Sequence, residues 1–579
     1  MRAPAAPAPC QGAHDKLAGV WDDDTKSAVR AAFERSERPL AAEAAARATD
    51  RLDAYAEQWV TARTRACEAT RVDGEQSTAL MDARMRCLDG RLRSLSALAG
   101  TFAEADDDVV DAAPEAAARL PAIDRCADVD YVTARVAPPD DPQLQQKVEA
   151  LRDRLARIDA MELAGQYEAG WTAVQQVRDE VAALDYAPLS TETALRVGML
   201  GLRTRHVPEA EAGFRQAFFD GRRVGDDETR ARAAVYLVRT LGLFAHDPEA
   251  GLAWAEHARA EVDRFADPRL RGDLLNHLGV IRHDQGEFDQ AIALHREALA
   301  VRREALGPEH PDCGHSLMEL GLSLHAAGKW DEGVASVDDS VTVLRAALGD
   351  SHPIVAHVYG NMAATLANSG KLTQASEYFE RTAQAWSRVE GPGSGSAAMA
   401  LTSGAMAAHR DGAHEREGEL FDRALAIYDR TTDPEAASRR SWAQTNRAIS
   451  RMDDGDVETG VTELAAIVTE LETRESDDRP YTYTWLAIGY GRLERHDDAL
   501  APLQRAMALH ETAGTQGPEL GRTLFELGRN AYARGDVEAG REQVRRAMQT
   551  LPPPNPDGHD RFAALRDKWG GWLVEHDAA

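Results

Sequence analysis

The sequence predicts an all-α protein in which about ten helical hairpins stack into a solenoid behind a small helical module. Alanine, leucine, arginine and glutamate dominate the 579 residues, whereas aromatic residues make up only 6% and β-branched runs are scarce. This composition is typical of helical proteins. In addition, a marker residue, usually glycine, recurs at intervals of 39 to 43 residues. Such a period indicates repeated helical hairpins, which must stack on one another to bury their apolar faces.

Composition shifts divide the chain into five expected segments. Proline and aspartate in APPDDPQ and proline in LPPPNPDG mark the two ends of the repeats. Trp569 and Trp572 then lie on a last helix that is expected to cover the open apolar end. The expected segments are a flexible N-terminus (1–15), a helical cysteine-bearing module (16–135), a linker (136–145), the repeat solenoid (146–551) and a C-terminal capping helix (552–579).

The overall charge and hydropathy exclude two classes of partner. A formal net charge of −29 argues against nucleic acid, because phosphate binding needs clustered lysine and arginine. No segment approaches the ~18 uninterrupted apolar residues of a membrane-spanning helix, and the first ten residues contain no apolar signal-peptide core. We therefore expect no membrane insertion by this chain itself, and a protein or peptide as partner.

Four of the five cysteines fall in the first 126 residues, and no CxxC pair is present. The four are Cys10, Cys67, Cys87 and Cys126, whereas Cys313 stands alone. In an oxidising compartment they could form two disulfides, for which three pairings exist. The alternative is four unrelated buried thiols.

The stretch CEATRVDGEQS (67–77) crowds acids, hydroxyls and one arginine around a glycine. Gly74 supplies a break, and Glu75, Gln76 and Ser77 suit the first turn of a following helix. We interpret the stretch as a capped turn between two helices. A recognition loop is the alternative.

The marker positions define ten units, each read as a helix, a tight turn at the marker and a second helix. Five residues after the marker the residue is small in nine of ten units, and Glu417 is the exception. Small residues at this slot predict close crossing of the two helices. The markers are Gly165, Arg205, Ala245, Gly286, Gly328, Gly370, Gly412, Gly455, Glu494 and Gly535.

The middle of the chain resembles tetratricopeptide repeats of the kinesin-light-chain type. The resemblance is carried by LLNHLGVIRHDQGEFDQAIALHREALAVRREALGPEHPD, whose LGPEHPD connector returns one repeat later as LGDSHPI. It implies a right-handed solenoid that binds proteins or peptides in its concave groove. The lysine and asparagine pattern of chaperone-binding repeats is absent.

The first module carries a second resemblance. CEATRVDGEQS followed by ALMDARMRCLDGRL, with LAGVWD and LPAIDRCADV, resembles the region after the kinase domain in bacterial multidomain serine/threonine protein kinases. This implies a scaffold or sensor module of a kinase-type signalling system. The alternative is a kinase-derived protein that lacks the catalytic domain. The chain would be cytoplasmic if complete, or on the extracytoplasmic face if it is a fragment of a membrane-tethered kinase, where the four cysteines should pair.

The sequence contains two partial matches to catalytic or metal-binding motifs, and neither is complete. His409–Asp411 reads HRD, but Arg416 stands where a kinase catalytic loop needs asparagine, and no DFG occurs. His310, Cys313 and His315 have metal-like spacing, yet the matching position of Cys313 in the next repeat is Val355. We therefore predict no enzyme activity, no cofactor and no metal site.

The groove-facing positions implied by the repeat resemblance lie 13, 10, 6 and 3 residues before each marker. Histidines in the middle and arginine with aromatic residues near the end would suit an acidic or aromatic-bearing peptide. The alternative is that several of these side chains only pack between repeats. The candidates are His283, His315, His325, His357, Met406, His409, Trp442, Tyr481, Arg522, Phe525, Arg529 and Tyr532.

Overall fold

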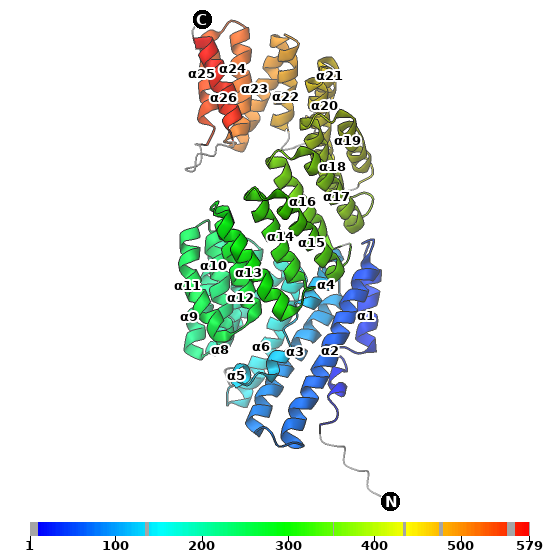
Figure 1. Cartoon of the computed structure of the whole chain (residues 1–579), viewed down its shortest axis with the longest axis vertical. Helices are drawn as coiled ribbons and strands as arrows, with labels where there is room; N and C mark the ends of the chain where they lie inside the picture. Colours follow the sequence, from blue (N-terminus) through cyan, green and yellow to red (C-terminus); the bar gives the residue numbers. More distant parts are fainter. Residues whose placement is uncertain are drawn as a thin grey trace, which may run out of the picture. The chain divides into compact units, whose positions relative to one another are not determined.

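The computed structural model is helical throughout the residues that it describes. These residues are 10–133, 138–350, 352–431, 436–473, 479–552 and 562–577, and they contain no strand. The predicted all-α hairpin architecture is confirmed (Figure 1). Among the described helices, none combines the length and the apolar character needed to cross a membrane.

The described chain divides into two compact units. The first unit runs to Thr365 and includes Arg388–Gly391, and the second consists of Leu366–Ser387 and the residues from Pro392 onward. The first unit therefore holds the N-terminal module and the first five hairpins, and the second holds the last four hairpins and the final helix.

The N-terminal module is a bundle of helices with a core of its own. Trp59, Phe33 and Phe102 are almost fully buried in it. Its aspartate runs begin helices, since Asp22 and Asp106 accept hydrogen bonds from backbone N–H groups in the first turns. The elements are η1 (His14–Leu17), α1 (Asp23–Glu34), α2 (Ala41–Arg71), α3 (Thr78–Ala103), α4 (Asp107–Ala118), η2 (Asp124–Ala127) and α5 (Val129–Thr133).

The stretch that joins α2 to α3 is a capped turn. Gly74 adopts a left-handed φ of +67°. The Ser77 side chain accepts a hydrogen bond from the Leu80 N–H, and Gln76 donates to the carbonyl of Ala66. The four cysteines of the module form two disulfides, Cys10–Cys67 and Cys87–Cys126, and Cys313 is a buried free thiol.

Within the described residues, ten helical hairpins follow the module. Five lie in the first unit: α6 (Pro142–Leu163) with α7 (Tyr167–Leu184), α8 (Ala187–Arg203) with α9 (Val207–Val224), α10 (Asp227–Arg239) with α11 (Pro248–Phe265), α12 (Pro268–Asp284) with α13 (Phe288–Leu306), and α14 (Pro311–Ala326) with α15 (Trp330–Leu348). The sixth, α16 (Pro353–Asn368) with α17 (Leu372–Glu390), is divided between the units.

Four more hairpins and a final helix make up the rest of the second unit. They are α18 (Gly395–Arg410) with α19 (His414–Tyr428), α20 (Ala436–Asp453) with α21 (Val457–Leu471), α22 (Arg479–Arg492) with α23 (His496–Ala513), α24 (Pro518–Ala533) with α25 (Val537–Gln549), and α26 (Ala563–Asp577).

The turn inside each hairpin explains the marker residues. Every glycine marker has a positive φ, as do Arg205 (64°) and Glu494 (59°), where an L side chain takes the strained left-handed conformation. Ala245 does not, and this assignment was wrong by one residue. The π-helix η3 (Thr240–Phe244) inserts an extra residue after α10, so that the left-handed residue is His246 (φ 55°).

The small residues five positions after the markers lie where paired helices cross most closely. A Cβ added to Gly333 of α15 would lie 2.9 Å from the carbonyl oxygen of Gly321 on α14. Gly540 of α25 is equally confined, at 2.8 Å from the Gly528 carbonyl oxygen. Larger side chains are therefore excluded from these crossings.

Candidate functional site

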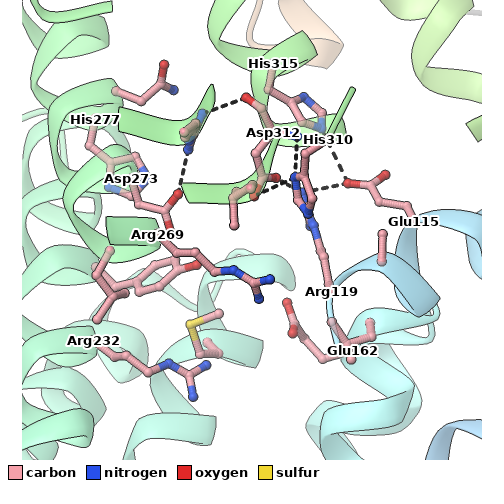
Figure 2. Close-up of a pocket in the computed structure, with 18 of the residues that line it drawn as sticks. Glu115, Arg119, Glu162, Arg232, Arg269, Asp273, His277, His310, Asp312 and His315 are labelled. Carbon is pink, nitrogen blue, oxygen red and sulfur yellow. Dashed lines mark hydrogen bonds and ion pairs between the residues drawn. The ribbon is translucent and has the colours of Figure 1, made fainter. Parts of the chain in front are cut away.

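A large cavity of the first unit has a volume of about 1290 Å³ and lies between the module and the repeats. The first helices of the hairpins, α8, α10, α12 and α14, line one side, and residues of α3, α4 and η2 line the other. The cavity thus occupies the helix face that the repeat resemblance assigns to ligands. Figure 2 shows polar and charged side chains converging on it from both sides.

Arginines dominate the centre of the cavity. Arg232 of α10 and Arg269 of α12 point into it (Figure 2). Neither guanidinium, nor that of Arg239, forms an ion pair with a carboxylate among the described residues. Burial lowers the pKa of Arg239, and the nearby charges of Arg203 and Arg119 lower it further. Nine arginines and eleven aspartates and glutamates line the cavity, so its lining as a whole carries no excess of positive charge, and these three guanidiniums form a local cationic patch within it.

Aromatic rings lie beside these cations. The guanidinium carbons of Arg205 and Arg239 lie 5.2 and 5.4 Å from the ring centroid of Phe244. Arg125 lies 4.8 Å from the ring of Tyr131 and 5.0 Å from that of Phe265. These contacts hold the cations by cation–π attraction and leave guanidinium N–H groups able to donate to a ligand.

One carboxylate of the module reaches the repeats. Glu115 of α4 lies 2.6 Å from Arg119, 3.4 Å from the His315 Nε2 and 3.6 Å from the His352 Nε2. Burial alone would raise the pKa of Glu115. However, the hydrogen bond from His315 and the charge of Arg119 hold that pKa well below its usual range. The Glu115 carboxylate is therefore a fixed anion that joins the module to α14.

The remaining acids of the cavity are partly neutralised. Asp273 forms an ion pair with Arg302, with 2.6 Å between the carboxylate and guanidinium atoms. The Arg119 guanidinium lies 3.8 Å from the Asp312 carboxylate. Burial raises the pKa of Glu319. The site therefore places arginines that can donate to an anion beside acids of which some are paired or tend toward neutrality, whereas others, such as Asp124 and Asp284, form no ion pair among the described residues.

The metal-like spacing at residues 310–315 has a structural explanation. His310 Nδ1 accepts a hydrogen bond from the Asp312 N–H and caps α14, and His352 does the same for the Ile354 N–H of α16. The Cys313 thiol donates to the carbonyl of Gly307. The recurrent His-Pro pair is thus a helix cap.

The predicted groove residues separate into distinct places. Only His315 reaches the large cavity. In the second unit, Arg522, Phe525, Arg529 and Tyr532 line a cavity of about 420 Å³ that α26 covers. There Trp569 stacks on Phe525 with ring centroids 5.6 Å apart, and Tyr532 meets the edge of Trp572.

The other candidates lie apart from both cavities. His283 bonds to Ser323 of the next hairpin, His325 is buried and Met406 packs against a core. Tyr481 donates to Asn446 and lines a small hollow with Arg522. His357 is exposed, Trp442 is half-buried, and His409 contacts Glu417.

Several cavity residues were missed by the sequence reasoning. Arg232 and Arg239 stand 13 and 6 residues before Ala245, and Asp273 stands 13 before Gly286. The same offsets applied to these units would have found them. Nothing in the sequence indicated that Glu115 and Arg119 of the module face α14.

Comparisons with known proteins agree on the repeats. The family model described as tetratricopeptide repeat matches residues 270–332, 314–381 and 355–430. The chain therefore carries tetratricopeptide repeats in this region. No curated protein matches the chain.

Several solved structures are similar to parts of the chain. The kinesin-light-chain TPR-like repeats from Podospora anserina are 21% identical, covering 36% of this chain and 99% of that one, with a TM-score of 0.29. The apo quorum sensor NprR from B. thuringiensis is 12% identical, covering 69% and 99%, with a TM-score of 0.39. A signal transduction ATPase with a tetratricopeptide repeat sensor from Pyrococcus horikoshii is 12% identical, covering 61% and 53%, with a TM-score of 0.40.

Proposed function

We propose that this chain, which carries tetratricopeptide repeats, is a protein-interaction or sensor module that binds an acidic segment of a partner in the large cavity. The observation that carries the proposal is the convergence of Arg232, Arg239 and Arg269 on one cavity without carboxylate partners among the described residues. The three side chains are half-buried, and charge-assisted hydrogen bonds from their guanidiniums to an anionic ligand would stabilise this arrangement.

The size of the cavity favours a peptide over a small metabolite. Its volume of about 1290 Å³ exceeds the ~300–1,000 Å³ of typical small-molecule pockets. Aromatic rings such as Tyr131, Tyr236 and Phe265 line it beside the arginines. A segment that alternates carboxylates with apolar side chains fits both kinds of lining.

The contact between the module and the repeats is a feature that suits a sensor, because a ligand could displace it. Its helix α4 lies over α14 and is held there by the contacts of Glu115 and Arg119. A ligand carboxylate that bound Arg119 would compete with Glu115 and Asp312. Binding would thereby change how tightly the module is held, which couples recognition to a structural response.

Binding can be measured with short labelled peptides by fluorescence anisotropy. The probe is a peptide rich in Asp and Glu with interspersed Leu, compared with the same peptide carrying Asn and Gln. The wild type should prefer the acidic peptide, and Arg232→Ala or Arg269→Ala should weaken binding about tenfold, the loss expected for a charge-assisted hydrogen bond.

Arg222→Ala is the matched control, because Arg222 is exposed on α9 and does not line the cavity. Equal affinity for the charged and neutral peptides, or an equal loss in the control, would contradict the proposal.

The signalling context rests on the first module. Its resemblance to the region after the kinase domain in bacterial serine/threonine kinases supports a role in kinase-type signalling. The alternative is a kinase-derived protein without the catalytic domain. In both cases purified protein should neither bind ATP with magnesium nor phosphorylate itself, since HRD at 409–411 lies at the end of α18. Autophosphorylation that persists in Asp411→Ala and is lost when the first module is deleted would contradict this proposal.

A further inference from the structure

The second unit contains a cluster of histidines and carboxylates at two neighbouring hairpin turns. His409 lies in the last turn of α18 and His414 begins α19, on either side of the left-handed Gly412. Asp453 and Asp454 stand at the equivalent turn of the next hairpin. One ligand atom each from His409, His414 and Asp454 lies within 4.8 Å of the others.

A fourth side chain joins them from an unusual position. Glu417 occupies the slot that is small in nine of ten repeats, and only 4% of it is exposed. Its Oε2 lies 3.2 Å from the His409 Nδ1 and 3.5 Å from the His414 Nδ1. The His414 Nδ1 lies 3.1 Å from the Asp454 Oδ1. This repeat therefore places a carboxylate at the close crossing where its neighbours have glycine or alanine.

We propose that His409, His414, Glu417 and Asp454 bind a divalent transition-metal ion, with zinc as the best fit. Two imidazole nitrogens and two carboxylate oxygens form a donor set that zinc accepts. Tetrahedral zinc with bonds of about 2.0–2.1 Å separates its ligand atoms by roughly 3.3 Å. Three of the six distances between the ligand atoms, 3.1, 3.2 and 3.5 Å, are close to the edge of such a tetrahedron, and the remaining side chains would have to draw together around the ion.

The surroundings orient the His409 ring for this role. Its Nε2 lies 3.4 Å from the Asp453 Oδ2, and Asp453 is itself held by Arg492 at 2.6 Å. Histidines that bind metals through one nitrogen commonly donate the other N–H to a carboxylate in this way. The Ser450 hydroxyl lies 3.1 Å from the Nδ1, and it would have to rotate away from the bound ion.

The structural role of such a site follows from its position. The ion would join the turn of α18 and α19 to the turn after α20, and thus connect two consecutive repeats. Zinc would stiffen this part of the second unit, because an ion that binds only the folded arrangement stabilises it.

Isothermal titration of the full chain with zinc chloride, after removal of metals by chelator and dialysis and without a histidine tag, tests the proposal. One zinc ion per chain should bind, and Co²⁺ in its place should give the visible absorption of tetrahedral coordination. Glu417→Ala restores the small residue of the other repeats, so it should fold normally while zinc affinity falls at least tenfold.

His414→Ala, at a half-exposed position, should give the same loss, whereas His257→Ala, an exposed histidine of α11, should leave the affinity unchanged. Circular dichroism of each variant verifies the fold. The proposal is overturned if the wild type binds no zinc, or if Glu417→Ala and His414→Ala bind it as the wild type does.

Discussion

Glu115 on α4 and His315 on α14 lie 3.4 Å apart, which joins the N-terminal module to the repeats through a half-buried carboxylate. The contact is not isolated, because Arg47 and Arg51 of α2 donate to the carbonyls of Ala346 and Ala347 at the end of α15. The module and the first repeats therefore belong to one compact unit, and the cavity lies between them.

Removing the Glu115 carboxylate should loosen this contact. Glu115→Ala removes the carboxylate that contacts Arg119, His315 and His352, and because Arg119 is more than a third exposed, the loss should be about 1–2 kcal/mol. Urea unfolding at neutral pH should show a loss of this size. Glu57→Gln, an exposed carboxylate of α2, should change stability by less than about 0.5 kcal/mol. Equal effects in the two variants would show that the Glu115 contact does not hold the module.

Acid should destabilise the first unit over a defined pH range. Burial lowers the pKa of His352 to about 4 from its ordinary 6.5, against the opposing charge of Glu115, while His315 and Arg119 lower it further. Between these pH values the unfolded chain binds the proton more strongly, so stability falls as pH decreases from about 6.5 to 4.

His352→Gln should reduce the loss of unfolding free energy between pH 6.5 and pH 4, by on the order of 3 kcal/mol at most. His310 and His295, whose pKa values are lowered by burial to about 4 and about 3, would retain the rest. Unfolding free energies measured at several pH values test this expectation. A slope unchanged by His352→Gln would contradict it.

Glycine at the turn between α22 and α23 should raise the stability of the second unit. Glu494 has a φ of +59° and is exposed, so its side chain contributes strain and few contacts. Glu494→Gly should stabilise the second unit by about 0.5–1 kcal/mol, net of the added chain entropy of glycine. Thermal unfolding measures the gain. Gly535→Ala, the opposite change at a matched marker with a φ of +92°, should lose stability.

The close crossing of α24 and α25 should not tolerate a methyl group. A Cβ on Gly540 would lie 2.8 Å from the Gly528 carbonyl oxygen, so Gly540→Ala should cost about 1–3 kcal/mol. Gly491→Ala on α22 is the control, since a Cβ there meets nothing within 4 Å and alanine favours helix. It should leave stability unchanged or raise it slightly. Equal losses in both variants would exclude the crossing as the cause.

The repeat period predicted most of the fold because each hairpin repeats the same local requirements. Glycine at the turn and small residues at the crossing are visible in the sequence one unit at a time. The π-helix after α10 was not predicted, since no residue type marks it, and it moved the turn from Ala245 to His246. Counting back from each marker to the groove-facing positions likewise finds Arg232 and Arg239, but it does not find Glu115.

Glu115 faces His315 because two segments about 200 residues apart pack together, and no local pattern records that packing. The same holds for α26, whose tryptophans cover Phe525 and Tyr532 and so occupy positions that were predicted to face a ligand. Sequence offsets identify a face of the solenoid, whereas packing decides which parts of that face remain open.

The module's cysteines supply the last prediction. Cys10–Cys67 and Cys87–Cys126 enclose sequence separations of 57 and 39 residues, so each bridge should stabilise the module by about 2–4 kcal/mol by restricting the unfolded chain. Protein unfolded without reductant should accept one thiol label, at Cys313, and after reduction it should accept five. The Cys87→Ser/Cys126→Ser double variant should lower the unfolding midpoint more than Cys313→Ser does. Five labels on unreduced protein purified from its native host would refute the pairing and indicate a reducing compartment.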